Sequence, residues 1–553
     1  MGLLFNNLFR KKSVSAITDV ESHSDGLHRV LTVKDLTFFG IAAIIGAGSF
    51  SSIGSACFSG GPAVIFLFII CAIACGFTAM CYADFATRVP ASGSAYTYAY
   101  VSFGELAAWV IGWALLMEYS IGNIYVAFSW SGYFVNLIET FGIHLPMWLT
   151  HNYSDSHQAF LDGTAGKFSE SWTTAPTIMG VKFIIDLPAV MINILVTWLV
   201  YVGTKESRNA SNIMVYIKLA IILLVIVVGA YYVDIDNWTP FMPNKFTGVM
   251  AGVSGVFFAY IGFDAVSTLA EESKNPQRDL PRGMLYSLII CTIVFIILAL
   301  VLTGMVSYTA LNVSDPLAEV FALKGVKWML FIVSIAAVVA MTSVILVFQM
   351  GQPRIWMAMS RDGLLPKKFA EIHPKYKTPA FATLITGLVV GIPIFFTTPK
   401  FVLDFTSIGT LFAFVLVCGG VLVLPRNMES KEKGKFKMPY VNSKFIVPVL
   451  TIIGFSIAIK YYPNSIYVDD ANTIYHYPMI IFYAVWVVLA ALSFVKNYSL
   501  IPVLGLLSCC YLLTGMGWTN WLMFLVWLVI GLVVYFMYGY RKSKLHVKRR
   551  AIK

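Results

Sequence analysis

Apolar runs of membrane-spanning length recur along the chain and are separated by shorter polar segments. A helix that crosses the hydrocarbon core of a bilayer needs about 20 consecutive, mostly apolar residues. Runs near this length predict fourteen spans, at about 35–58, 62–83, 105–138, 183–202, 210–232, 248–270, 284–307, 328–351, 379–397, 402–425, 445–461, 478–495, 499–514 and 519–540. The pattern therefore predicts an all-α polytopic membrane protein.

Composition agrees with this pattern. Of the 553 residues, 58% are hydrophobic and 12% are charged, whereas soluble proteins are about 45–50% apolar and about 25% charged. When the first residues are placed in the cytoplasm, most of the Lys and Arg residues fall on the cytoplasmic side, which follows the positive-inside rule and accounts for the net charge of +11. We therefore predict a multi-pass protein of the plasma (cytoplasmic or inner) membrane that contacts lipids, has both termini in the cytoplasm and binds no nucleic acid.

Cysteine and histidine residues give no sign of metal or cofactor chemistry. All eight cysteines fall in apolar spans, where they are interpreted as small core residues. The eight histidines lie in tails and loops without the spacing of metal ligands. The loops also contain no Ser/His/Asp set. We therefore predict no enzyme activity, no metal site and no cofactor.

Small residues interrupt the first span. Glycines and serines alternate with apolar residues there, at Gly40, Gly46, Gly48, Ser49, Ser51, Ser52 and Gly54. One interpretation is a seam of small residues that lets helices pack closely. The other is an unwound helix, whose free N–H groups and positive dipole end attract an anion such as a carboxylate.

The sixth span carries a glycine and a charge at lipid depth. It begins as an apolar helix, contains Gly262 and Asp264, and ends in a polar run at 271–282. A charge inside a span costs about 2.5–3.5 kcal/mol on insertion scales, so it usually faces a cavity or a partner. A glycine at that depth lets the helix open and present backbone groups to a small ligand. This stretch predicts a transporter with its substrate near the middle of the bilayer.

The two interrupted spans occupy corresponding places in two sets of five spans, one starting from the cytoplasm and the other from outside. Such pairs indicate an inverted repeat with the binding site between its halves. The predicted divisions are a cytoplasmic tail (1–34), two five-helix repeats (35–232 and 248–425), two inserted helices (440–498), two final helices (499–540) and a basic cytoplasmic tail (541–553). No protein partner for the inserted helices is indicated.

Two further ionisable residues lie inside predicted spans. Lys218 lies about 8 residues, or roughly 12 Å, from the cytoplasmic edge of the fifth span, and Asp264 lies at a matching depth of roughly 10 Å. Lys218 either extends its amine to the interface or is a buried amine that exchanges a proton. The matching depths leave a Lys218–Asp264 interaction geometrically open. Glu118, in the third span, is either a protonated structural carboxyl group or part of a functional site.

Span eight supplies two further interpretations. Met341, near its middle, is either an ordinary core residue or a flexible wall for a substrate side chain. The basic run from Arg354 to Lys377 is interpreted as a determinant of topology that contacts anionic lipid.

Three motifs in this chain resemble those of the amino acid–polyamine–organocation (APC) superfamily, in the branch of cationic amino acid transporters and their bacterial proton-coupled relatives. They are Gly46-Ala-Gly48, Phe257-Phe-Ala-Tyr-Ile-Gly-Phe-Asp264 through Asn275-Pro-Gln-Arg-Asp-Leu-Pro281, and Ala358-Met-Ser-Arg-Asp-Gly-Leu-Leu-Pro366. The last two are long and specific. The resemblance covers about 30–430 and resumes near 499–540.

The resemblance implies a LeuT-like five-plus-five inverted-repeat fold with about 14 transmembrane helices, and secondary active transport of amino acids. The substrate carboxylate would meet the amides around Gly46, and the substrate ammonium would meet carbonyl groups of Phe258 and Ile261. The implied substrate-binding set is Ile45, Gly46, Ala47, Gly48, Ser49, Phe258, Ile261, Gly262 and Met341. The implied proton-coupling residues are Lys218, Glu118 and Asp264, with the lysine standing where sodium-coupled members bind a cation, so a proton is the expected coupling ion.

Departures from the family pattern bear on the substrate. Ala114 stands where relatives have an acidic residue, and the pocket face of span eight carries none either, which favours a small or medium neutral L-amino acid over a cationic one. The leading hypothesis is a proton-coupled symporter. The alternatives are an amino acid exchanger, a cationic amino acid permease, or a membrane sensor that binds an amino acid without transporting it.

Overall fold

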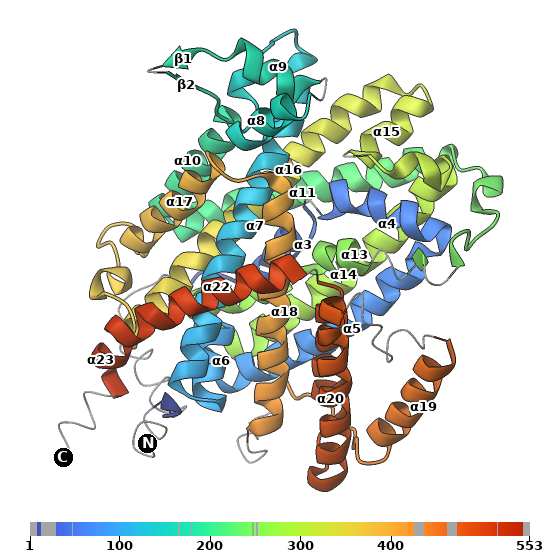
Figure 1. Ribbon diagram of the computed structural model, residues 1–553. Helices are drawn as coiled ribbons and strands as arrows, with labels where there is room; N and C mark the ends of the chain where they lie inside the picture. Colours follow the sequence, from blue (N-terminus) through green and yellow to red (C-terminus); the bar gives the residue numbers. More distant parts are fainter. Residues whose placement is uncertain are drawn as a thin grey trace.

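The structure is a computed structural model that describes residues 8–12, 29–46, 48–163, 166–178, 180–245, 248–249, 253–313, 315–424, 436–461, 473–516 and 518–545. Within these ranges the chain is almost entirely helical (Figure 1). The strands of this part of the chain, β1 (Thr177–Ile178) and β2 (Val181–Lys182), form one short antiparallel hairpin. The predicted all-α fold class is confirmed.

The helices of the first half are α3 (Val33–Ile44), the π-helical turn η1 (Gly48–Ser52), α4 (Ile53–Gly60), α5 (Val64–Arg88), α6 (Ala95–Ser102), α7 (Glu105–Glu139), α8 (Tyr153–Leu161), α9 (Lys167–Thr174), α10 (Leu187–Val202) and α11 (Thr204–Tyr231). The second half has α13 (Val253–Tyr260), the 3-10 helix η5 (Phe263–Glu272), α14 (Pro276–Met305), α15 (Pro316–Leu323), α16 (Lys327–Arg361), α17 (Ala380–Ile394) and α18 (Pro399–Val423). The chain ends with α19 (Ile446–Tyr461), α20 (Thr473–Lys496), α21 (Leu500–Thr514), α22 (Trp518–Val534), the π-helical turn η10 (Tyr535–Gly539) and α23 (Tyr540–Lys542).

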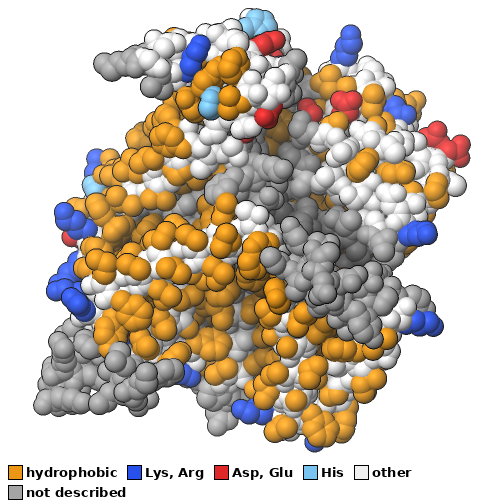
Figure 2. Space-filling view, viewed as in Figure 1, with side chains coloured by type: hydrophobic (Ala, Val, Ile, Leu, Met, Phe, Trp, Pro, Cys, Tyr) orange, Lys and Arg blue, Asp and Glu red, His pale blue; other side chains and the backbone are white. Residues whose placement is uncertain are grey.

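Membrane-spanning helices dominate this part of the chain. By length and composition, eight of its helical segments can cross a membrane, namely Ile53–Arg88, Glu105–Glu139, Lys205–Tyr231, Pro276–Met305, Lys327–Arg361, Phe405–Val423, Tyr477–Lys496 and Trp518–Lys542. Four shorter apolar helices are Leu187–Val202, Ala380–Ile394, Ile446–Lys460 and Leu500–Thr514. In Figure 2, hydrophobic side chains cover most of the described flank, with charged side chains toward its edges. The exact number of spans remains a prediction.

Helix packing is symmetric when the two five-helix sets are exchanged. The long helices α7 and α16, each third in its set, pack on each other, and so do α5 with α14 and α10 with α17. The third helix of each set also packs on the fifth helix of the other set, α7 on α18 and α16 on α11. The second helix of each set packs on the broken first element of the other, α14 on α3 and α5 on α13 and η5. These are the contacts expected of the five-plus-five fold, in which the first element of each set is a broken helix.

The helices that follow the second set attach to this core through aromatic residues. Trp113 of α7 and Trp527 of α22 stack with a centroid separation of 4.8 Å, and each indole N–H donates to the other residue's carbonyl oxygen, at 2.9 and 3.0 Å. Gly531 lies against Trp113, and its carbonyl accepts the Trp109 indole N–H at 2.8 Å. Helix α19 packs mainly on α20, which in turn packs on α21.

Candidate functional site

The first broken helix opens at the predicted place. Helix α3 ends at Ile44, Ile45 has extended backbone angles (φ −81°, ψ 93°), and the chain resumes as the π-helical turn η1 at Gly48. The carbonyl of Gly46 accepts the amides of Ser49 and Phe50 at 3.0 and 3.1 Å and the Ser49 hydroxyl at 2.9 Å. Ala47 lies outside the described residues. The unwound-helix interpretation of this span is therefore confirmed.

The second broken helix opens at Gly262. Helix α13 ends at Tyr260, and the chain turns through Ile261 and Gly262 into the 3-10 helix η5. Gly262 has a φ of +116°, in the left-handed region that favours glycine. Phe258, whose carbonyl is predicted to bind substrate, lies inside α13.

Glycines bring the two breaks against each other. A Cβ atom at Gly262 would lie 2.6 Å from the Cβ of Ala43 in α3, and one at Gly48 would lie 2.5 Å from the Cα of Ala259 in α13. A Cβ at Gly46 would collide with the side chain of Val344 in α16. The small residues therefore serve close packing as well as unwinding, and the two interpretations of the first span both hold.

The side chain of Lys218, which belongs to α11, reaches the C-terminal end of α3. Its side chain is fully buried, and its ammonium group donates to the carbonyl oxygens of Ile41 and Ala42, both at 3.1 Å, and of Ile45 at 2.8 Å. It also donates to the hydroxyl of Ser343 in α16 at 2.9 Å. The last carbonyls of a helix lack intrahelical donors and lie at its negative dipole end, so this position suits a cation. Lys218 thus links α11, the break in α3 and α16.

The Lys218–Asp264 interaction that the matching depths left open is not formed in the structure. The ammonium group points to α3 and α16, while Asp264 interacts electrostatically with Glu118. An equal depth in the membrane does not determine the direction in which each side chain points. In the structure, Lys218 binds carbonyl oxygens at the end of α3 instead of Asp264. The sequence analysis also did not identify Ser343 as a partner of Lys218. The only indication was its polar hydroxyl group in the mostly apolar middle of α16.

A cluster of buried polar groups lies beside the second break. The side chains of Glu118 and Asp264 are 2% and 1% exposed. Oε2 of Glu118 lacks a hydrogen-bond partner within the described part of the chain, as do the hydroxyl groups of Tyr82 and Tyr119, while the Asp264 carboxylate lies beside backbone amides of the second break. All four side chains interact electrostatically. The cluster thus has acceptors and donors for protons or water molecules.

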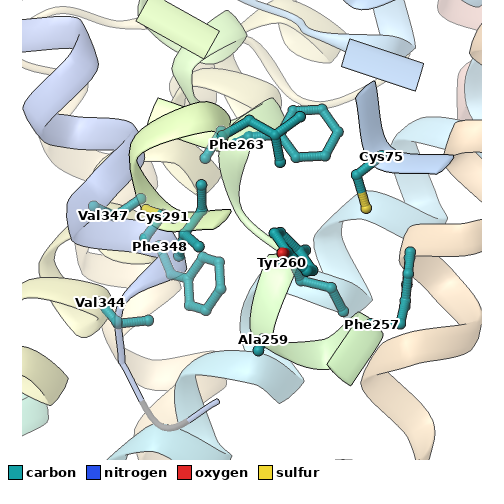
Figure 3. Close-up of a cluster of buried hydrophobic side chains, with 14 of the residues drawn as sticks. Cys75, Phe257, Ala259, Tyr260, Phe263, Cys291, Val344, Val347 and Phe348 are labelled. Carbon is teal, nitrogen blue, oxygen red and sulfur yellow. The ribbon is translucent and has the colours of Figure 1, made fainter. Parts of the chain in front are cut away.

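Apolar side chains of α16 and α13 lie opposite each other near the second break (Figure 3). In Figure 3, Val344 and Phe348 of α16 lie on one side, with Ala259 and Tyr260 of α13 on the other. The Phe348 ring meets the Tyr119 ring edge-on, with centroids 5.5 Å apart. Met341, the predicted wall residue, is fully buried three residues before Val344 on α16.

The described residues contain no group of three or more His, Cys, Asp or Glu side chains that could hold a metal ion.

Comparisons with known proteins agree on one family. A family model described as amino acid permease matches residues 31–489, and a second, described as C-terminus of AA_permease, matches residues 498–543. The branched-chain amino acid permease BcaP of Bacillus subtilis is 37% identical over 98% of this chain and 99% of its own length. The methylthioribose transporter of the same organism is 36% identical over 98% of this chain. The vacuolar cationic amino acid transporter 4 of Arabidopsis thaliana is 36% identical over 76% of this chain and 67% of its own length.

Replacement of Gly262 by alanine should destabilise the protein. The left-handed backbone of Gly262 and the 2.6 Å approach to Ala43 leave no room for a methyl group, and such strain costs about 1–3 kcal/mol. We expect Gly262→Ala to lower the temperature of thermal unfolding in detergent. Gly76→Ala is the control, since its Cβ would have no neighbour nearer than 4.0 Å. Equal unfolding temperatures for the two variants would contradict this account of the break.

Proposed function

Because the chain belongs to the amino acid permease family, we propose that it is a proton-coupled symporter of a small or medium neutral L-amino acid. The family makes the chain a membrane transporter rather than an enzyme. The observation that carries the proposal is the buried ammonium group of Lys218, which binds three carbonyl oxygens at the point where α3, the first half of the first broken helix, ends.

Proton exchange at Lys218 would act directly on this break. A charged lysine has three N–H donors and no acceptor, which suits a set of carbonyl and hydroxyl oxygens. A neutral amine directs a lone pair at those oxygens and leaves part of the set unsatisfied, at a cost of about 1–3 kcal/mol for a buried acceptor. Gain or loss of the proton would therefore favour different conformations of the broken helix, as alternating access requires.

The site offers donors for a substrate carboxylate at the first break. The backbone amides of Gly46 and Gly48 make no hydrogen bond within the described residues. The amides of Ser49 and Phe50 already donate to the carbonyl oxygen of Gly46. Gly46, Ala47 and Gly48 are accordingly the proposed carboxylate-binding residues, with Ile45 and Ser49 at the edges of the set. The carbonyls of Phe258 and Ile261, next to Gly262, are the proposed acceptors for the substrate ammonium.

Glu118 and Asp264 are the proposed proton-carrying pair that works with Lys218. Two buried carboxyl groups that interact electrostatically favour the protonation of one of them, because two buried charges together are costly. The unpartnered hydroxyl groups of Tyr82 and Tyr119 supply polar neighbours for that proton. A proton is the proposed coupling ion rather than sodium, since the Lys218 ammonium already occupies the cation position at the first break.

The proposal of a neutral substrate rests on Ala114, on the apolar face of α16 and on the name of one relative. Val344 and Phe348 present no charge toward the breaks, and BcaP is named for branched-chain amino acids. The methylthioribose transporter is nearly as similar, so identity at this level leaves the substrate open. Met341 is a proposed wall of the side-chain pocket.

Uptake into proteoliposomes tests the proposal. A panel of radiolabelled neutral and cationic amino acids, together with methylthioribose, would be offered with and without an inward proton gradient. We expect a neutral amino acid to accumulate only with the gradient. Gradient-independent exchange, preference for a cationic amino acid, or binding without flux would each overturn the proposal in favour of an exchanger, a cationic permease or a sensor.

Removal of the Lys218 charge should abolish coupling. With one proton per substrate, a gradient of one pH unit supports about tenfold accumulation, since one unit corresponds to about 1.4 kcal/mol. We expect Lys218→Gln to reduce this accumulation to none. The control is Lys205→Gln, which changes an exposed lysine on the same helix. Full gradient-driven accumulation by Lys218→Gln would rule out the coupling role.

Removal of the Glu118 carboxyl group should separate exchange from net transport. Glu118→Gln keeps the shape of the side chain but removes one site for the coupled proton, so we expect counterflow without a gradient to persist while gradient-driven accumulation falls. Glu139→Gln, at the exposed end of α7, is the matched control. Unchanged dependence on external pH in Glu118→Gln would show that this carboxyl group carries no coupled proton.

A further inference from the structure

Two arginine–glutamate pairs join α16 to the end of η5. Arg354 Nη2 lies 2.6 Å from Glu272 Oε1, and both side chains are 1% exposed. Arg361 Nη1 lies 2.7 Å from each carboxylate oxygen of Glu271, with 19% and 9% of the two side chains exposed. The arginines are seven residues apart, two turns along one face of α16. Both belong to the region interpreted from sequence as a lipid-contacting basic run.

The glutamates belong to the elements that carry the breaks. The carbonyl of Glu272 accepts the amides of Val30 and Leu31, just before α3, both at 3.0 Å, and Lys274 N–H donates back to Leu31 at 2.9 Å. The start of α3 and the end of η5 are therefore bound together through their backbones. The two ion pairs connect this joined unit to α16, on the other side of the candidate site.

Both ends of the described chain attach next to Arg361. The Asp362 carboxylate accepts Lys12 Nζ at 2.7 Å and the Tyr96 hydroxyl at 2.8 Å, while its carbonyl accepts the amide of Lys544 at 3.0 Å. In Figure 1 the first described residues and α23 lie toward α6, at the end of the molecule away from α8 and α9. The N-terminal residues thus contact the segment that carries the ion pairs.

A buried carboxylate anchors the two chain ends. Glu105, at the start of α7, is fully buried and accepts Arg10 Nη2 at 2.8 Å and the hydroxyls of Tyr100 and Tyr535 at 2.8 and 2.9 Å. Ser543, from the C-terminal segment, donates a fourth hydrogen bond. Residues 8–12, η10 and the segment after α23 therefore meet at one carboxylate.

We propose that Arg354–Glu272 and Arg361–Glu271 form the gate on the side of the chain ends, and that residues 8–12 are the latch that keeps it closed. The inference rests on the proposed transport function, because a gate presupposes a substrate path between the broken helices and α16. Separation of α16 from η5 would expose all four charges to water, which solvates them in place of their partners. Such pairs can close and reopen, whereas removal of one partner leaves a buried charge uncompensated.

The latch acts by holding the segment from Arg361 to Gly363. Lys12 and Lys544 bind Asp362 from the two chain ends, and a Cβ atom at Gly363 would lie 2.5 Å from the carbonyl oxygen of Lys542. Loss of the Lys12 contact would leave Asp362, next to Arg361, with the Tyr96 hydroxyl and the Lys544 amide as its remaining partners among these and would weaken the hold on this segment. The opening of the gate would then depend on whether the N-terminal residues are docked.

Hydrogen–deuterium exchange of the full chain in lipid nanodiscs tests the gate without measuring transport. The variants are Arg361→Gln, Lys12→Gln and the reversed pair Arg361→Glu with Glu271→Arg. The control is Arg278→Gln, which removes a half-exposed arginine that pairs with the buried Asp279 in the first turn of α14. Arg361 is chosen over Arg354 because it is the less buried of the two arginines.

We expect Arg361→Gln to speed amide exchange in a peptide covering 263–275 by about tenfold, the factor that one lost charge-assisted hydrogen bond corresponds to. Lys12→Gln should raise it by a smaller factor, and the reversed pair should restore it toward the parent rate. Exchange in α7 and α22 should stay unchanged, which separates gate opening from unfolding. The proposal is overturned if Arg361→Gln and Lys12→Gln match Arg278→Gln, or if the reversed pair opens as far as Arg361→Gln.

Discussion

The ammonium group of Lys218 replaces the hydrogen-bond donors that α3 loses where its helix stops. Of the three carbonyl oxygens at this end that accept the ammonium group, that of Ile41 also accepts the Ile45 amide, that of Ala42 also accepts the Ser343 hydroxyl, and that of Ile45 is nearest to the ammonium nitrogen at 2.8 Å. The three N–H bonds of Lys218 are shared among these carbonyls and the hydroxyl of Ser343 in α16. The break, the position of α11 and the contact between α3 and α16 therefore depend on the same group.

The second broken helix depends on the first through glycine contacts. Gly48 meets Ala259, and Gly262 meets Ala43, so each break occupies space that a side chain at the other would fill. Farther along, the backbone bonds between Leu31 and the segment 272–274 tie the same two elements again. A change at Lys218 would thus be transmitted to both breaks, and through η5 to the arginine–glutamate pairs with α16.

Much of this arrangement could be predicted from the sequence, because glycines and charges at lipid depth have few structural explanations. Gly46, Gly48 and Gly262 marked the two breaks, and Lys218 was recognised as an unusual charge. Its actual partners could not be predicted, because counting residues along a helix gives depth but leaves the direction of the side chain open. Arg354 and Arg361 were assigned to topology and lipid contact because their partners Glu272 and Glu271 precede them by 82 and 90 residues, and only the fold brings them together. The roles of Glu118, Asp264 and Met341 in transport remain predictions.

The central claim is that substrate movement and proton movement are one process controlled at Lys218. The direct measurement is the internal pH of proteoliposomes, followed with a trapped pH-sensitive dye when substrate is added outside without any imposed gradient. The account predicts acidification of the interior that keeps pace with substrate uptake in the parent protein and vanishes in Lys218→Gln. Substrate uptake without acidification in the parent protein would contradict it.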